Sequence, residues 1–376
     1  MAVDVGKVVG YLDKLAPQSL ALPGDRVGLQ LGSVSASVKK ILVALDPDRE
    51  TLDTAANLKV DMLVTHHPLF YKDVKSVRLD QPFGDLIARA IKNSLNIFCM
   101  HTNFDIIPQV VSYQLVKTLG YSPENADLID IYGSENFLKL VYFVPAGYED
   151  AIREAIALAG AGKLGDYSHC TFQVEGTGTF KPLEGSKPFI GRHGAIERVK
   201  EVRVETILPA GKRADVLNVL RANHPYEEIA YDFYQLDRPG NSLGLGLIVN
   251  LDDGVTIDKL ATTCRTKLSN PGIRYWAGSK SLYRRVAFCG GSGGSLIESA
   301  ARMGADLLVA GDFRYHDMKL AQALDLALLD IGHDYSEQPG VEYLKEYIER
   351  IIIDNGYDLE VHLKTLTPRV WHYEKR

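Results

Sequence analysis

The sequence predicts an α/β fold in which two similar α/β units form one domain and an α+β domain is inserted between them. Apolar runs typical of buried strands alternate with helical patterns. The stretch 61–105 is matched by the stretch 306–337, and this alternation is interrupted once, in the middle of the chain. We therefore expect residues 1–133 and 237–376 to form one discontinuous domain and residues 134–236 to form the inserted domain.

Length and composition favour a two-domain globular protein. At 376 residues the chain is longer than a single hydrophobic core usually supports. The net charge of −6 and the lack of a basic cluster argue against nucleic acid as the main partner, although a nucleotide can still bind locally. The four cysteines form no C-x-x-C pair, which favours buried thiols. No stretch resembles a signal sequence or a membrane span, so we expect a cytoplasmic protein without a membrane partner.

The first elements are a helix, a turn and a buried strand. Residues 1–16 carry apolar side chains at helical spacing. Residues 24–32 predict a turn that enters a strand, where Asp25 is either a plain turn residue or an acceptor that orients a nearby histidine. Residues 40–46 form a continuous apolar run, typical of a parallel strand buried on both faces, and Asp46 ends it.

The next two strand ends carry histidines and a carboxylate. One apolar run ends at His66 and His67, and Pro68 keeps His67 extended so that both imidazoles can serve one site. The following run ends at His101, with Asp105 four residues later. In open α/β sheets, functional groups gather beyond the carboxyl ends of the strands.

The second half repeats this spacing. Residues 306–312 correspond to residues 61–67, and a further apolar run leads to His333 and Glu337, again four residues apart. Three or more imidazoles with two carboxylates exceed what one tetrahedral zinc needs and suit two divalent ions. The sequence therefore predicts a metal centre, the alternative being that these histidines are only polar strand ends.

Two prolines predict helix starts after these strand ends. Pro108 and Pro339 each stand at the first position of a helical pattern. The patterns stop near Gly120 and Gly356, so we expect equivalent helices in the two halves.

A glycine-rich turn follows the apolar run 286–289 and precedes a helical pattern over 296–303. Its residues are Gly290, Gly291, Ser292 and Gly293. Free backbone amides at such a turn are candidates for holding a phosphate, although no P-loop lysine follows and similar turns also serve as tight connections. His316, after the next strand end, is a candidate for proton transfer.

The middle of the chain predicts an α+β domain of the ferredoxin-like split type, since two β-α-β units follow one another. The predicted elements are strand 137–145, helix 149–159, strand 171–175, strand 201–208, helix 214–223 and strand 229–235. His224 with Glu227 and Glu228 could bind a metal or an effector, with a solvated turn as the alternative.

Five motifs resemble those of the NIF-three-like family, whose members are often labelled GTP cyclohydrolase I type 2 homologues. They are residues 64–70 (VTHHPLF), 101–105 (HTNFD), 290–293 (GGSG), 311–316 (GDFRYH) and 332–337 (GHDYSE). The resemblance implies a toroidal homohexamer with two metal ions per subunit. The ligands that it implies are His66, His67, Asp105, His333 and Glu337.

The inserted domain resembles the PII-like or CutA-like domain of longer family members, through residues 176–180 (GTGTF), the turn 191–197 and residues 224–228 (HPYEE). Residues 106–111 replace the glycine-rich loop that usually follows the HTN-x-D motif of the family. That departure leaves the ligand Asp105 intact but weakens the transfer of a substrate from the family.

Two hypotheses about function follow. In the first, the protein is a metal-dependent hydrolase that acts on a nucleotide, and the family label implies opening of the guanine ring of GTP. Zinc is the expected metal, with iron and manganese as alternatives. In the second, it is a non-catalytic metal-binding ring protein with a regulatory or interaction role. Turnover by the metal-loaded protein distinguishes them.

His101 and His316 are the candidate catalytic residues of the first hypothesis. His101 matches His333 in the repeat, but the resemblance assigns metal binding to His333 and not to His101. An uncoordinated imidazole beside two cations stays neutral near pH 7, so His101 is predicted to act as a general base.

Overall fold

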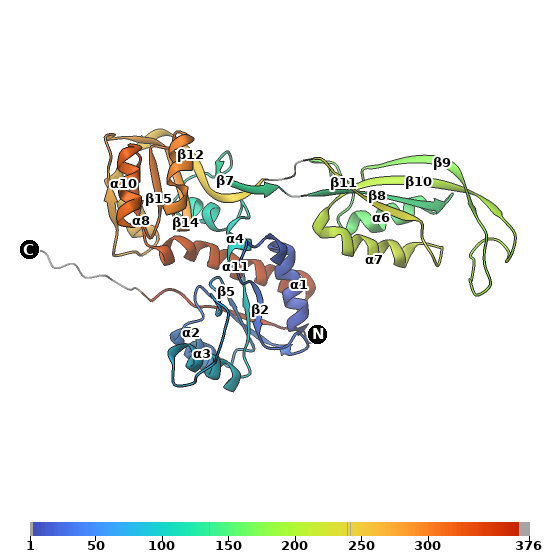
Figure 1. Ribbon diagram of the computed structural model, residues 1–376, viewed down its shortest axis with the longest axis horizontal. Helices are drawn as coiled ribbons and strands as arrows, with labels where there is room; N and C mark the ends of the chain where they lie inside the picture. Colours follow the sequence, from blue (N-terminus) through green and yellow to red (C-terminus); the bar gives the residue numbers. More distant parts are fainter. Residues whose placement is uncertain (1–2, 135, 239, 241, 368–376) are drawn as a thin grey trace, which may run out of the picture. The chain divides into compact units, whose positions relative to one another are not determined.

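The structure, a computed structural model, divides into two compact units (Figure 1). It describes residues 3–134, 136–238, 240 and 242–367. The core unit comprises Met1–Tyr132 and Leu243–Arg376, and the internal unit comprises Gly133–Ser242. The ends of the predicted discontinuous domain, residues 1–2 and 368–376, lie outside the described residues.

A five-stranded sheet forms the first half of the core unit, in the order β17-β4-β5-β6-β2. Its members are β2 (Gly28–Leu31), β4 (Lys40–Ala44), β5 (Met62–Thr65), β6 (Asn96–Cys99) and β17 (Glu360–Leu363). All neighbours are parallel except β2, which runs antiparallel to β6. Every residue of β5 and β6 is buried, as expected of parallel strands covered on both faces. A separate two-stranded sheet pairs β1 (Val3–Asp4) with β3 (Ser37–Val38).

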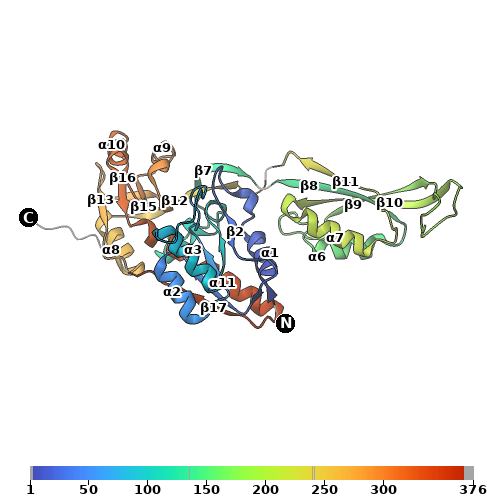
Figure 2. The same ribbon diagram turned by 60° about the horizontal axis from the view of Figure 1, so that its bottom comes forward.

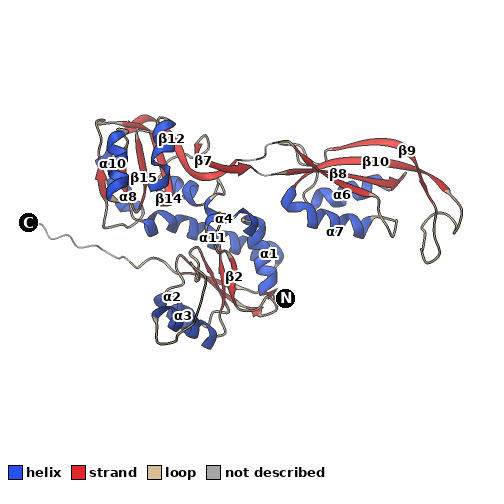
Figure 3. Cartoon of the chain, in the orientation of Figure 1, coloured by secondary structure: helices blue, strands red, loops and turns tan. Residues whose placement is uncertain are grey.

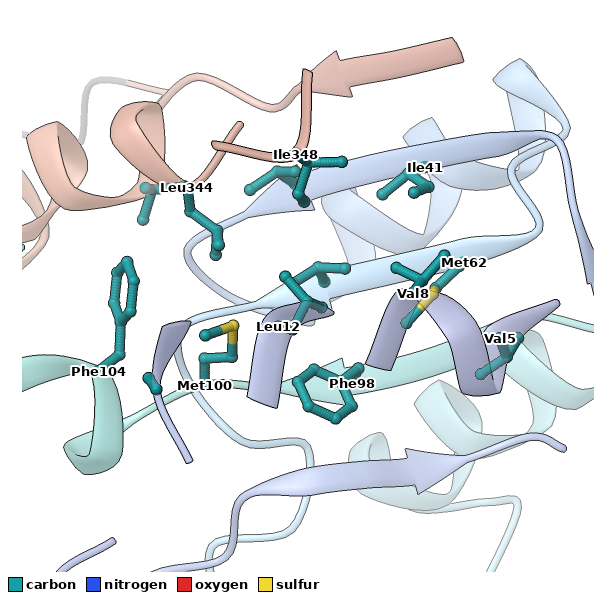
Figure 4. Close-up of a cluster of buried hydrophobic side chains, with 14 of the residues drawn as sticks. Val5, Val8, Leu12, Ile41, Met62, Phe98, Met100, Phe104, Leu344 and Ile348 are labelled. Atoms are coloured by element: carbon teal, nitrogen blue, oxygen red, sulfur yellow. The ribbon is translucent and has the colours of Figure 1, made fainter. Parts of the chain in front are cut away.

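Helices cover both faces of the five-stranded sheet. On one face α1 (Val5–Leu15) and α11 (His333–Asn355) pack against apolar side chains of β4, β5 and β6, as Figure 4 shows for Leu12 and Ile348. On the other face α2 (Arg49–Leu58) and α3 (Pro82–Lys92) bury a second apolar cluster. The strand ends are therefore held by packing from both sides.

A six-stranded sheet forms the second half of the core unit, in the order β13-β16-β15-β14-β12-β7. Its members are β7 (Asp127–Ser134), β12 (Ser242–Val255), β13 (Arg274–Trp276), β14 (Tyr283–Ser292), β15 (Leu307–Gly311) and β16 (Ala327–Asp330). Strands β14, β15 and β16 are parallel. One face packs against α5 (Val111–Thr118) and α8 (Ile257–Lys267), and the other against α9 (Ile297–Arg302) and α10 (Tyr315–Ala323).

Helix α11 connects the two sheets of the core unit. It contacts β14 and β15 of the six-stranded sheet and β4 and β17 of the five-stranded sheet. Gly332, with a φ of 77°, precedes its first residue, and Gly356 in the left-handed conformation caps its end. The first turn of α11 is thereby placed beside strand ends of both sheets.

Two predicted helix starts are wrong. The helix expected to begin at Pro339 begins at His333, and Pro339 lies buried inside it. A proline removes the hydrogen bond of its own nitrogen, and packing of the flanking turns can offset that loss. The helix expected at Pro108 is α5, which begins at Val111 after the short helix α4 (Thr102–Asp105). Both helices end beside the glycines predicted to stop them.

The internal unit is a four-stranded antiparallel sheet with two helices on one face (Figures 2 and 3). The strand order is β11-β8-β10-β9. In chain order the elements are β8 (Phe137–Pro145), α6 (Glu149–Leu158), β9 (Thr171–Phe180), β10 (Glu197–Pro209), α7 (Arg213–Asn223) and β11 (Tyr231–Leu236). All predicted elements occur in the predicted order, with β9 and β10 longer than expected because they pair with each other along a long hairpin.

Candidate metal centre

Six predicted side chains come together where the two halves of the core unit meet. They are His66, His67, His101, Asp105, His333 and Glu337. The first three follow the ends of β5 and β6, and Asp105 ends α4. His333 and Glu337 lie one helical turn apart at the start of α11, so both project from the same face of the helix. Two parallel strand ends, the short helix α4 and the start of α11 thus supply all six.

Glu337 lies at the centre of the cluster. Its Oε1 is 3.1 Å from His333 Nε2 and 3.5 Å from His66 Nε2, and its Oε2 is 3.1 Å from His67 Nε2. The Nε2 of His66 is also 3.4 Å from Asp105 Oδ1. One carboxylate thus contacts three imidazoles from both halves of the core unit.

Each of the four histidines is oriented through its Nδ1, which donates to an oxygen behind it. The pairs are His66 with the Met100 carbonyl at 2.8 Å, His67 with Asp46 at 2.8 Å, His101 with Asp25 at 2.9 Å and His333 with Asp312 at 2.9 Å. This arrangement leaves each Nε2 lone pair available, which is how metal-binding histidines are commonly held. His101 shares it with the three histidines implied as ligands.

The donor set fits a metal ion. The side chains form three groups, and within each group the ligand atoms lie within 4.8 Å of one another. The groups are His66, His67 and His101; His67, His333 and Glu337; and His66, Asp105 and Glu337. His66 Nε2, Asp105 Oδ1 and Glu337 Oε2 are buried without a hydrogen-bond partner. Buried polar atoms are costly unless they are satisfied, and a cation satisfies all three together. The cluster could therefore hold a metal ion.

The electrostatics of the cluster are those of carboxylates that attract imidazolium groups. Burial lowers the pKa of His67, but the neighbouring carboxylates of Asp46 and Glu337 outweigh it and raise the pKa to about 10. Burial likewise lowers the pKa of His333, and Glu337 with Asp312 raises it to about 9. Although burial raises the pKa of Glu337, the surrounding imidazoles hold it well below its usual range.

The acceptors that orient the histidines were partly predicted from the sequence. Asp25 accepts from His101 and from the backbone and hydroxyl of Thr102, as expected of an acceptor that orients a histidine. Burial raises the pKa of Asp25, yet these hydrogen bonds hold it below its usual range, so it is a charged acceptor. The Met100 carbonyl was missed, because a backbone acceptor leaves no signal in the sequence.

Tyr71 was also missed. Its ring centroid lies 6.4 Å from that of His67 and 6.5 Å from that of His101. Partial desolvation beside the cluster raises the pKa of its hydroxyl, helped by the charge of Asp46, although 60% of the residue is exposed. It reaches the histidines from the loop between β5 and α3, where no pattern in the sequence marks it.

The glycine-rich turn contacts the cluster through packing. A Cβ on Gly291 would lie 2.4 Å from Glu337 Oε1, so only glycine fits there. The amide of Gly290 donates to Ser112 Oγ, that of Gly291 to Ser336 Oγ, and that of Gly293 to the Gly311 carbonyl. Because protein acceptors already use these amides, the contacts favour a tight connection over a phosphate cradle.

Two other predicted histidines lie outside the cluster. His316 is exposed in the first turn of α10, and within the described residues it is in none of the three ligand groups. His224 is buried in the internal unit, where its Nε2 donates to the Phe143 carbonyl and its Nδ1 accepts from the amide of Tyr226. Both nitrogens of His224 therefore have structural partners.

Comparison with known proteins gives the family. The sequence model of Duf34/NIF3 (NGG1p interacting factor 3) matches residues 3–368. The chain belongs to this family. Two relatives, from Halalkalibacterium halodurans and Bacillus subtilis, are each 37% identical to it and are named GTP cyclohydrolase 1 type 2 homolog. The first match covers 94% of this chain and 94% of the relative, and the second covers 90% of each.

Solved structures agree with membership in the Duf34/NIF3 family. A Bacillus cereus protein related to NIF3 superposes with a TM-score of 0.87 at 34% identity, over 99% of each chain. The predicted resemblance to the NIF-three-like family is thus confirmed. Among the described residues of this Duf34/NIF3 protein, no helix combines the length and apolar character needed to cross a membrane.

Proposed function

We propose that the cluster is a dinuclear metal centre of a hydrolase. Two of the ligand groups, His66 with Asp105 and Glu337, and His67 with His333 and Glu337, share the same carboxylate. A carboxylate common to two groups can bridge two ions, and this sharing carries the proposal. Zinc is the first metal to test, followed by iron and manganese, since imidazole and carboxylate ligands suit all three.

Bound divalent ions would supply Lewis acidity and lower the pKa of water, the chemistry of metal-dependent hydrolysis. The remaining work belongs to the residues of the chain. The hydrogen bond from His101 Nδ1 to Asp25 leaves Nε2 facing the cluster, where it can accept a proton. His101 is proposed as the general base, with His316 as the second candidate.

The proposed substrate is a nucleotide, with GTP tested first because the relatives carry the name GTP cyclohydrolase 1 type 2 homolog. The glycine-rich turn, Gly290 to Gly293, remains the sequence candidate for phosphate binding. Since its amides have protein acceptors, a phosphate would have to displace them.

The test is turnover by protein loaded with zinc, manganese or iron, using GTP and a panel of nucleotides and phosphoesters. Release of formate or phosphate is expected from the wild type and should be abolished in Glu337→Gln. Metal-loaded protein that turns over none of these substrates would support the second hypothesis, a metal-binding ring protein that acts by interaction.

The finer architecture is also a proposal. We propose that the two halves of the core unit are copies of one α/β unit, that residues 134–236 are a ferredoxin-like, PII-like insertion, and that the protein is a homohexamer. The β-α-β-β-α-β order of the internal unit supports the second point. Analytical ultracentrifugation tests the hexamer. Replacing residues 134–236 by a short linker tests the insertion, since a metal-loaded core should remain.

A further inference from the structure

The internal unit contains a pocket of about 400 Å³ on the sheet face away from its helices. Phe143 and Glu201 line it, and they alternate with Tyr142 and Val202, which pack in the cluster beneath α6 and α7. This volume lies in the range of roughly 300 to 1,000 Å³ typical of small-molecule sites. The pocket is confined to the internal unit and is remote in sequence from the metal ligands.

The loop between β9 and β10 closes over this pocket. The amide of Lys187 donates to Glu227 Oε1 at 2.8 Å, which ties the loop to the turn after α7. The ring of Phe189, in the same loop, lies 6.4 Å from Tyr226 and 5.8 Å from Tyr148. The loop is therefore held in place by a hydrogen bond and by ring contacts.

Aromatic rings form most of the apolar wall. Phe180 lies 5.9 Å from Tyr226, and both line the pocket together with Phe143 and Phe189. The Tyr226 hydroxyl donates to Glu201 Oε1 at 3.0 Å. Burial, with help from Glu201, raises the pKa of Tyr226, so this hydroxyl keeps its proton at neutral pH. Phe189 is half exposed, and a ligand would cover it.

Negative charge predominates around these rings. Three carboxylates, Glu201, Glu227 and Glu228, line the pocket with a single ammonium, Lys181. Within the described ranges none of the three forms an ion pair, and none belongs to a group of ligand atoms suited to a metal. Aromatic faces beside carboxylates attract organic cations and disfavour phosphates.

We infer that this pocket binds a planar aromatic cation, with its ring against Phe180, Phe189 and Tyr226 and its charge toward Glu201 and Glu228. The aromatic wall selects a flat ring, and the carboxylates select positive charge. This ligand class differs from the nucleotide proposed for the metal centre, so the two sites can be occupied independently.

The experiment is saturation-transfer NMR on the full chain with benzamidine and with benzoate, which have similar shapes and opposite charges. Benzamidine is expected to bind and benzoate to give no signal at the same concentration. Glu201→Gln should weaken benzamidine binding by about tenfold, as expected when a charged partner is lost. Glu228→Gln, at the exposed rim where unfolding is not a concern, should weaken it by about threefold.

Two controls separate this pocket from general charge effects and from the metal centre. Glu175→Gln removes an exposed carboxylate of β9 that does not line the pocket, and Glu337→Gln alters the metal cluster. Both should leave benzamidine binding unchanged. The inference is overturned if benzoate binds as well as benzamidine or if benzamidine does not bind. It is also overturned if benzamidine binding is unchanged in both Glu201→Gln and Glu228→Gln.

Discussion

The two halves of the core unit use their strand ends differently. After β5 and β6 the first half places four ligand-capable side chains, His66, His67, His101 and Asp105. In the second half, β15 ends at Gly311 and is followed by Asp312. A Cβ on Gly311 would lie 2.5 Å from the backbone nitrogen of His333, and Asp312 accepts from His333 Nδ1. The first half supplies ligand candidates from its strand ends, whereas the strand end of the second half supplies space and orientation for His333 and Glu337, which are carried by α11.

Burial also differs between the side of the cluster that follows β5 and the side that His333 occupies. His66 is 1% exposed and Glu337 is 3% exposed, while the side chain of His333 is 31% exposed. The cluster is therefore closed toward β5 and open beside His333. A substrate would approach from the open side, where Asp312 is itself exposed.

The largest expected effect comes from the residue that joins the halves. Glu337→Gln should remove at least one ion per chain, because both proposed ion positions use this carboxylate. Elemental analysis measures it, with Glu346→Gln, an exposed residue of the same helix, as the matched control. Full metal content in Glu337→Gln would show that this carboxylate is not shared by two ions and would contradict the dinuclear assignment.

Metal affinity should rise steeply with pH. His67 and His333, one from each half, have pKa values raised to about 10 and about 9 in the metal-free protein. Both are protonated below those values, and a metal binds only the neutral imidazole, so protons compete more strongly as pH falls. Between pH 6 and 8 each released proton should add about tenfold in affinity per pH unit. Titration with a competing chelator measures this slope. A metal affinity that does not change with pH would contradict competition between protons and the metal at His67 and His333.

His101 tests whether the first half supplies a base as well as ligands. We expect His101→Ala to keep both ions and to lower kcat by about a hundredfold, the usual scale of acid–base assistance. The comparison variant is His316→Ala, which alters an exposed histidine outside the cluster. Loss of metal in His101→Ala would make His101 a sixth ligand. Full activity with full metal would leave His316 as the candidate base.

The smallest expected effect concerns the space that Gly311 provides. Gly311→Ala should destabilise the fold by about 1 to 3 kcal/mol, because the added methyl meets the His333 backbone. The control is Gly10→Ala in α1, where a Cβ meets nothing within 4 Å and helix propensity should add roughly 0.5 to 1 kcal/mol. Denaturant unfolding measures the free energy of unfolding of both variants. An equal change in the two variants would contradict the clash expected at Gly311.

The sequence predicted the members of the cluster because they follow recognisable buried strands. His66, His67 and His101 end apolar runs, and the four-residue spacing of His333 and Glu337 fits one helical turn. The start of α11 was misplaced because Pro339 was given the role of a helix start, although six helical residues precede it in α11. Proline indicates where a helix can begin but does not exclude an earlier start.

Contacts between distant residues could not be predicted. The glycine-rich turn was a candidate for phosphate binding, with a tight connection as the alternative, and in the structure the amide of Gly290 donates to Ser112, 178 residues away, and that of Gly291 to Ser336, 45 residues away. Whether a backbone amide is free depends on what folds against it. The same limit applies to Tyr71, whose contact with His101 arises from the path of a loop.

The number of metal ions bound per chain decides whether the cluster is a dinuclear centre. Purified protein, stripped of metal and titrated with zinc, should bind two ions per chain by elemental analysis, because two ligand groups share Glu337. A stoichiometry of one or none would contradict the dinuclear centre.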